Sequence, residues 1–436
     1  MVMKQMSLFL VMLLIVVGCS QMNDNTNSPN ESIDISGTWT GFIEVPGSPL
    51  PIVLEFVKEN KWKGMISIPS QNVSDYPLSG LTVNEQNVTF SMEIAGQSIS
   101  FKGEVSNETF EGTFTQQGQS FPFKMTKGEL EKEREEAGET ISIETEKGTL
   151  KGVLLTPETN NPHPVVLIIP GSGPTDRNGN SSQLPGNNNS LKLLAERLAE
   201  EGIASLRYDK RGVGKNQSII SKEEDISFDL FVNDATHWIE KLNNSDRFTN
   251  VGVIGHSQGS LVGMLAAQQS EVDTFVSIAG ASRSIDEVIQ EQLAASLSEE
   301  TLQRSQSIFD ILKKGKTTQD VPKELQSVLR PSIQPFISSW MNYTPVSEIN
   351  KLTIPTLIIG GSTDLQVPPE AAKALHEANN ESEVIIIDQM NHVLKKAPMN
   401  REENVKTYSE PRLPLAEELV EEIMSFFQKH DFYTKE

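Results

Sequence analysis

Apolar and polar residues alternate in two different ways along this chain of 436 residues. Between residues 35 and 127, short runs with an apolar residue at every second position are separated by turn-forming glycines and asparagines. The clearest runs cover residues 38–43, 53–57, 88–92, 99–103 and 113–114. Evenly spaced strands of this kind are typical of a small antiparallel barrel or sandwich. We therefore expect an all-β domain over residues 35–127, in which Trp39 is a structural core residue.

From residue 141 the strand-like runs are apolar on both faces and alternate with helical runs. The strand-like runs cover residues 165–169, 203–208, 251–254, 275–279, 356–359 and 384–387, and the helical runs cover 191–200, 228–242, 261–268, 371–378 and 415–428. This alternation predicts a mostly parallel sheet with helices on both faces, hence an α/β domain over residues 141–430. Residues 141–145 and 150–155, joined at Lys147 and Gly148, predict a leading hairpin.

Two segments interrupt this regular pattern. Residues 284–349 are rich in Gln, Glu, Ser and Leu at helical spacing and separate two of the expected strands. We expect them to form a helical cap over the edge of the sheet where the site should lie. Residues 128–140 are highly charged and are expected to link the two domains.

The N-terminus has the pattern of an export signal. Lys4 precedes an uninterrupted apolar run over residues 8–17, which suits a signal peptide over 1–18 and is short for a membrane span. The run ends in Val16-Val17-Gly18-Cys19, which resembles a bacterial lipobox in which Cys19 is lipidated, although Val16 stands where Leu is usual. Residues 19–34, rich in Asn and Ser, are expected to be a disordered tether. We expect an exported protein, lipid-anchored on the outer face of the cell membrane. The alternative is an ordinary signal peptide that ends near a cysteine by chance.

Composition narrows the range of partners. Cys19 is the one cysteine, so an intramolecular disulfide is excluded. The formal net charge of −22 argues against nucleic acid as a partner, because polyphosphate is repelled by such a surface. The sequence carries neither a cluster of metal ligands at the usual spacings nor a dinucleotide fingerprint, so we expect no metal and no cofactor.

The chemistry-bearing motif is Gly255-His256-Ser257-Gln258-Gly259. It follows a strand-like run and opens a helical run, which is the strand–turn–helix context that makes this pattern informative. A serine on so tight a turn needs small neighbours two positions away on either side, and Gly255 and Gly259 meet that need. The sequence therefore predicts that Ser257 is a nucleophile.

At this motif the chain resembles the α/β-hydrolase superfamily, specifically its exported esterase and serine-aminopeptidase-like branch. The resemblance covers about residues 141–429 and leaves the β-rich domain outside it. It implies an α/β-hydrolase fold and a catalytic triad that arrives in the order Ser, acid, His.

The resemblance places the acid and the histidine after two late strands. Asp364 follows the strand at 356–359, and His392 follows the last strand at 384–387. His392 lies at the carboxyl end of a parallel strand, where open α/β sheets bind their ligands, whereas His163, His237, His256, His376 and His430 do not suit the role. Asp388 is the rival acid, but it lies only four residues from His392.

The resemblance also implies two backbone donors for an oxyanion. One is the N–H of Gln258, and the other is the N–H of Ser172 in the loop 170–177, where Pro170 stands in place of the usual His. Asp209 and Arg211, in the loop after the strand at 203–208, are expected to brace the oxyanion loop.

Together these features predict a serine hydrolase that cleaves small or medium carboxylic esters. A peptidase or amidase, or an acyltransferase, with the same triad remains an alternative, as does a surface-binding lipoprotein whose hydrolase fold is inert. The ligand of the N-terminal domain is not predicted.

Overall fold

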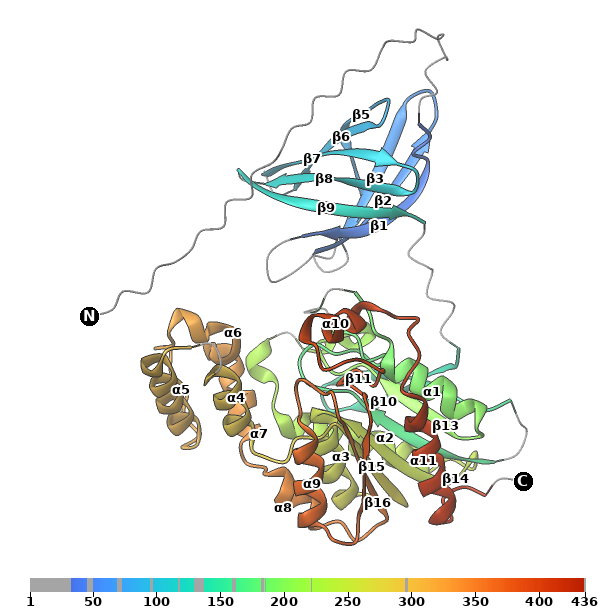
Figure 1. Cartoon of the computed structure of the whole chain (residues 1–436), viewed down its shortest axis with the longest axis vertical. Coiled ribbons are helices and arrows are strands. Elements are labelled where there is room, and N and C mark those ends of the chain that lie inside the picture. Colours follow the sequence, from blue (N-terminus) through green and yellow to red (C-terminus); the bar gives the residue numbers. More distant parts are fainter. Residues whose placement is uncertain are drawn as a thin grey trace, which may run out of the picture. The chain divides into compact units, whose positions relative to one another are not determined.

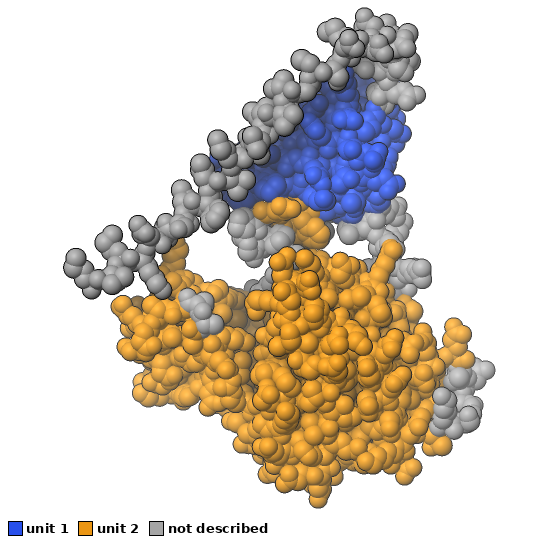
Figure 2. Space-filling view, viewed as in Figure 1, with its two compact units in different colours: residues 1–41, 52–67, 73–128 blue, residues 42–51, 68–72, 129–436 orange. Residues whose placement is uncertain are grey.

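The computed structural model describes residues 33–44, 50–68, 73–94, 97–116, 118–128, 137–158, 162–181, 184, 186–220, 222–294 and 297–434. They divide into two compact units, the first built mainly from the chain up to Gly128 and the second mainly from the chain beyond it (Figures 1 and 2). The predicted signal peptide over 1–18, Cys19 and all but the end of the tether over 19–34 lie outside the described residues. None of the described helices is long and apolar enough to cross a membrane.

The first unit is a single nine-stranded sheet in the order β4-β3-β2-β1-β9-β8-β7-β6-β5. Its strands are β1 (Gly37–Ile43), β2 (Leu50–Lys58), β3 (Trp62–Ile68), β4 (Val73–Pro77), β5 (Ser79–Asn84), β6 (Asn87–Ile94), β7 (Gln97–Ser106), β8 (Thr109–Gln116) and β9 (Gln119–Lys127). The two ends of the order, β4 and β5, are consecutive in the chain, so the sheet curls nearly closed (Figure 1). This agrees with the predicted barrel rather than a sandwich of two sheets.

Alternate side chains of these strands fill the inside of the curled sheet. Trp39 is fully buried, donates its indole N–H to the Ile35 carbonyl at 2.9 Å, and packs edge-on against Phe110. Phe110 in turn contacts Phe56 and Phe123. Trp39 is thus a structural core residue, as predicted.

The second unit contains an eight-stranded sheet in the order β10-β11-β13-β12-β14-β15-β16-β17. The strands are β10 (Glu139–Thr145), β11 (Gly148–Leu155), β12 (His163–Ile169), β13 (Ala204–Tyr208), β14 (Phe248–His256), β15 (Thr274–Ile278), β16 (Thr356–Gly361) and β17 (Glu383–Ile387). The hairpin β10–β11 is antiparallel, β11 pairs antiparallel with β13, and the remaining pairs are parallel. The α/β-hydrolase fold that the sequence predicts is confirmed, and its first strand begins at Glu139, within the expected linker 128–140.

Helices cover both faces of this sheet because its strands are apolar on both sides. Along β12, Val165 and Leu167 pack into one core with α2 (Phe228–Asn243), α3 (Gln258–Gln269) and α9 (Pro369–Ala378). Val166 and Ile168 point the other way and pack with α1 (Ser190–Glu200) and α11 (Glu417–Lys429). Successive side chains of a strand face opposite sides, so one apolar run serves two cores.

The segment between β15 and β16 is helical, as expected for residues 284–349. It contains α4 (Ile285–Ala294), α5 (Glu299–Leu312), α6 (Gln326–Leu329), α7 (Gln334–Trp340) and α8 (Pro345–Ile349). It has a small core of its own, formed by Ile308, Phe309, Leu312, Val321, Leu325, Leu329 and Ile337. We call this segment the cap.

Candidate active site

Ser257 occupies the turn between β14 and α3 with φ 54° and ψ −120°. Such positive φ values are uncommon outside glycine and cluster at functional sites. A Cβ at Gly255 would lie 2.3 Å from the Gly259 carbonyl oxygen, and one at Gly259 would lie 2.2 Å from the Ile169 carbonyl oxygen. Steric crowding therefore requires glycine at both positions, which is the physical reason for the spacing of the motif.

The structure places Asp364 and His392 in direct contact. Asp364 follows β16, His392 follows β17, and these two strands are parallel neighbours. The His392 Nδ1 lies 2.8 Å from the Asp364 Oδ2, and both side chains are buried. Asp388, the rival acid, is exposed and accepts a hydrogen bond from the Ser362 hydroxyl at 3.1 Å.

The surroundings of Asp364 keep its carboxylate charged. Burial opposes ionisation, but the neighbouring His392 and the backbone N–H groups of Val367 and Gln366 outweigh burial and hold the pKa of Asp364 below its ordinary value. These N–H groups donate to Oδ1 at 2.9 Å and 2.7 Å. A fixed carboxylate on Nδ1 leaves the Nε2 of His392 as the ring nitrogen that can accept a proton.

His256 connects the serine turn to the histidine loop. Its Nε2 donates to the His392 carbonyl oxygen at 2.8 Å, and the two rings lie 5.0 Å apart. Burial, followed by the nearby His392, lowers the pKa of His256 to about 4, so its ring is neutral at physiological pH. The side chain that precedes Ser257 thus fixes the position of His392, a role that sequence reasoning did not assign to it.

Asn391 is a second positioning residue that sequence reasoning missed. Its buried amide donates to the Asn404 Oδ1 at 3.1 Å and the Thr407 hydroxyl at 2.7 Å, and its oxygen accepts from the N–H groups of Val393 and Lys395. Asn404 in turn donates to the Thr363 carbonyl at 2.9 Å. The network joins the His392 loop to the residue preceding Asp364 through α10 (Arg401–Lys406), a helix that was not expected.

The loop that carries Ser172 passes beside the serine because β12 and β14 are adjacent in the sheet. A Cβ on Gly171 would lie 3.3 Å from the Ser257 Cβ and 3.7 Å from its hydroxyl oxygen. The other expected donor, the N–H of Gln258, belongs to the first residue of α3. N–H groups at the start of a helix have no partner within it and favour negative charge.

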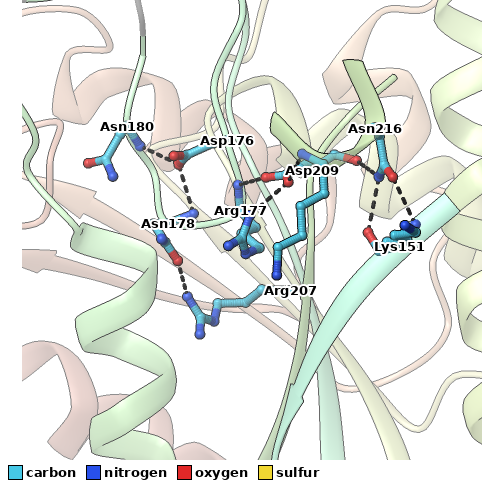
Figure 3. Close-up of polar contacts among 9 residues, drawn as sticks. Lys151, Asp176, Arg177, Asn178, Asn180, Arg207, Asp209 and Asn216 are labelled. Atoms are coloured by element: carbon cyan, nitrogen blue, oxygen red, sulfur yellow. Dashed lines mark hydrogen bonds and ion pairs between the residues drawn. The ribbon is translucent and has the colours of Figure 1, made fainter. Parts of the chain in front are cut away.

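Asp209 braces this loop, as the sequence suggested (Figure 3). Its carboxylate accepts the Arg177 backbone N–H at 2.9 Å and the Arg177 guanidinium at 2.7 Å. Asp176, beside it, accepts the N–H groups of Asn178 and Asn180, and burial raises the pKa of Asp176 to about 6 despite these bonds. Asn216 fastens the Asp209 carbonyl to Lys151 on β11.

The expectation for Arg211 was wrong. Its guanidinium forms two hydrogen bonds of 2.7 Å to the carboxylate of Asp234 on α2 and a third to the Thr145 hydroxyl. A buried carboxylate needs such a partner. Because Arg211 is bound to Asp234, it does not brace the oxyanion loop. Lys210 contacts the loop instead, because its Nζ donates to the carbonyls of Gly171 and Gly173.

A pocket of about 350 Å³ opens next to these groups. Gly173 and Pro174 of the Ser172 loop line it, together with Gln258. The cap contributes Arg330, Ile333 and Phe336 to its walls. The segment between β13 and α3 contributes further apolar and charged side chains: Val213, Ile220, Ile226, Phe231, Lys210, Arg211, Lys222 and Glu223. The pocket therefore meets both expected oxyanion-donor regions and the cap.

Comparison with known proteins agrees with this architecture. The family model described as serine aminopeptidase, S33, matches residues 188–329. The esterase EstD of Thermotoga maritima is 29% identical over 250 residues, which are 56% of this chain and 58% of that protein. The chain thus matches little more than half the length of this curated relative.

The chain is also similar to solved structures of other proteins. Est1E from Butyrivibrio proteoclasticus is 17% identical with a TM-score of 0.43, covering 67% of this chain and 99% of that one. The esterase EaEST from Exiguobacterium antarcticum is 20% identical with a TM-score of 0.38, covering 58% of this chain and 92% of that one. The sheet topology and the strained serine turn are those of an α/β-hydrolase fold, and part of this chain is similar in sequence to a serine aminopeptidase family model and to an esterase.

Proposed function

We propose that this protein is a serine hydrolase that cleaves carboxylic esters with small to medium acyl chains. The observation that carries the proposal is the buried Asp364–His392 pair, whose side chains lie 2.8 Å apart. His256 ties the His392 loop to the strained turn of Ser257. A relative described as an esterase, EstD, supports the choice of reaction.

The reaction follows from these groups. His392 removes the proton of Ser257 as the hydroxyl oxygen attacks the ester carbonyl, and Asp364 stabilises the imidazolium that forms. The N–H groups of Ser172 and Gln258 donate hydrogen bonds to the carbonyl oxygen and stabilise the negative charge that develops on it. His392 then gives its proton to the departing alcohol, and water releases the acyl group by the same steps.

The size of the pocket favours small and medium substrates. Its volume of about 350 Å³ lies near the lower end of the range for small-molecule sites. The side chains of Ile226, Phe231 and Phe336 offer apolar surface to an acyl chain or an apolar alcohol.

The charges of the pocket favour an ester substrate over a peptide with a free N-terminal ammonium group. A substrate ammonium needs a free carboxylate, but Glu223 is bound by Arg330 and by the Ser332 hydroxyl. Lys210 and Lys222 add further cations to the lining. Like charges would repel an amine at this site, so peptidase activity is the weaker candidate.

A substrate panel tests the proposal. We expect kcat/KM for p-nitrophenyl esters to exceed that for aminoacyl p-nitroanilides at least about a hundredfold, and to fall about tenfold once the acyl chain exceeds roughly ten carbons, because a pocket of this size holds no longer chain. Faster turnover of the anilides would favour a peptidase, and turnover of neither class would favour an inert fold.

We also propose that the protein is exported and anchored to the bacterial cell membrane through a lipid on Cys19. In cell fractionation, Cys19→Ala should move the protein from the membrane to the soluble fraction and leave kcat/KM unchanged, since the catalytic groups all lie in the second unit. A variant that stays with the membrane like the wild type would contradict the anchor.

A further inference from the structure

Lys210 is a buried cation that the ester-cleavage steps do not use. Its side chain leaves the loop after β13 and lies over the ring of Phe231, with Nζ 5.5 Å from the ring centre. Nζ donates to the carbonyl oxygens of Gly171 and, at 2.7 Å, Gly173. Among the described residues these two carbonyls are its hydrogen-bond acceptors, and no carboxylate pairs with it.

The two carbonyls flank the expected oxyanion donor. The Gly171 carbonyl and the Ser172 N–H belong to the same planar peptide group, in which they point in opposite directions. A donor that grips the carbonyl therefore fixes the direction of the N–H. Without it, the peptide is held less firmly, because Gly171 lacks the side chain that restricts backbone rotation on that side of the peptide.

We propose that the ammonium of Lys210 is the positioning group for the oxyanion donor, holding the Gly171–Ser172 peptide so that the Ser172 N–H faces the ester carbonyl at Ser257. The inference rests on the proposed hydrolase function. It also gives the ammonium an electrostatic effect, because a carbonyl bound by a cation polarises its peptide and makes the N–H a stronger donor.

The charged groups near Lys210 do not replace this link. Glu223 and Arg330 line the same pocket and pair with each other, and Lys222 is exposed there. Arg211 is taken up by Asp234 on α2, and the Asp209 carboxylate is bound by Arg177. The two glycine carbonyls thus depend on Lys210.

The link should weaken as the pH rises. Burial lowers the pKa of Lys210 to about 7, so the ammonium is charged below that pH and increasingly neutral above it. A neutral amine still donates hydrogen bonds, but without charge they are roughly half as strong. The contribution of Lys210 is therefore greatest at the acid end of the working range.

The test compares the full-length wild type with Lys210→Met on p-nitrophenyl acetate from pH 6 to pH 9. Loss of one oxyanion donor costs about 10² to 10³ in kcat, so loss of its support should cost about tenfold to a hundredfold at pH 6. We expect KM to stay within about threefold, because the interaction acts on the transition state. The ratio of wild-type to variant kcat should shrink at least about threefold by pH 9.

Two further variants make the result decisive. Lys210→Gln keeps two N–H donors without the charge and should give an intermediate kcat. If Lys210→Met is insoluble, Lys210→Gln takes its place, and the ratio of wild-type kcat to that of Lys210→Gln should show the same dependence on pH. Lys215→Met removes an exposed lysine of the same loop and should change kcat less than about twofold.

A folded Lys210 variant with wild-type kcat, or with a loss that is the same at every pH, would overturn the inference. These outcomes leave the proposed function standing as long as the wild type hydrolyses the ester and Ser257→Ala does not. A wild type without esterase activity would instead remove the function itself.

Discussion

Ser257→Ala should lower kcat for p-nitrophenyl acetate by about 10⁶-fold, the scale found when a serine nucleophile is removed from a triad enzyme. The residual rate would come from the oxyanion donors and the pocket alone. The fold should survive, because alanine fits the turn with the loss of a single oxygen, and we expect the free energy of unfolding to change by less than about 1 kcal/mol. Steady-state kinetics and urea denaturation of the pure protein measure both quantities.

Ser260→Ala is the matched control for this variant. Ser260 lies one turn further along α3, fully buried, and its hydroxyl bonds the Ser277 hydroxyl at 2.6 Å. Its loss should lower the free energy of unfolding by about 1 kcal/mol and leave kcat within about twofold. If Ser257→Ala retained more than about 1% of wild-type kcat, Ser257 would not be the nucleophile.

Asp364→Asn is expected to lower kcat by about 10⁴-fold with little change in KM, as in other triads that lose the acid. An amide can donate to the Nδ1 of His392 and so favour the tautomer with a proton on Nε2, which cannot accept the proton of Ser257. The asparagine oxygen can still accept from Gln366 and Val367, so the loop should keep its shape.

Asp388→Asn is the control that distinguishes the role of Asp364 as the triad acid from the effect of losing any negative charge nearby. Asp388 lies in the same region, but it is exposed and bonds Ser362 rather than His392. We expect its substitution to change kcat less than about twofold. If the two variants lost activity equally, the assignment of the acid would be wrong.

Much of the second unit could be predicted because its signals are local. Long apolar strands that alternate with amphipathic helices define a covered parallel sheet, and Gly255 and Gly259 mark the serine turn. The sheet order then brings Asp364 and His392 together from neighbouring strands. Catalytic residues can thus be predicted from sequence when each follows a recognisable strand and one of them lies in a recognisable motif.

Other features depend on contacts that no local pattern reveals. Strands β3, β4, β5 and β9 of the first unit were missed, since runs such as Trp62–Ile68, which contains Gly64, alternate weakly. Lys210 and Arg211 are adjacent basic residues in one loop, and the positions of Gly171 and Asp234 in the fold decide which of them holds the oxyanion loop. Asn391 likewise acquires its role only through Asn404 and Thr407.

Covalent labelling locates the activated serine most directly. The wild type is incubated with a fluorophosphonate, which labels a serine only where a neighbouring base removes its proton, and the modified peptide is identified by mass spectrometry. We expect one adduct per chain, on Ser257, formed at a rate that falls at least about a thousandfold in Asp364→Asn. An unlabelled protein, or an adduct on another residue, would contradict this expectation.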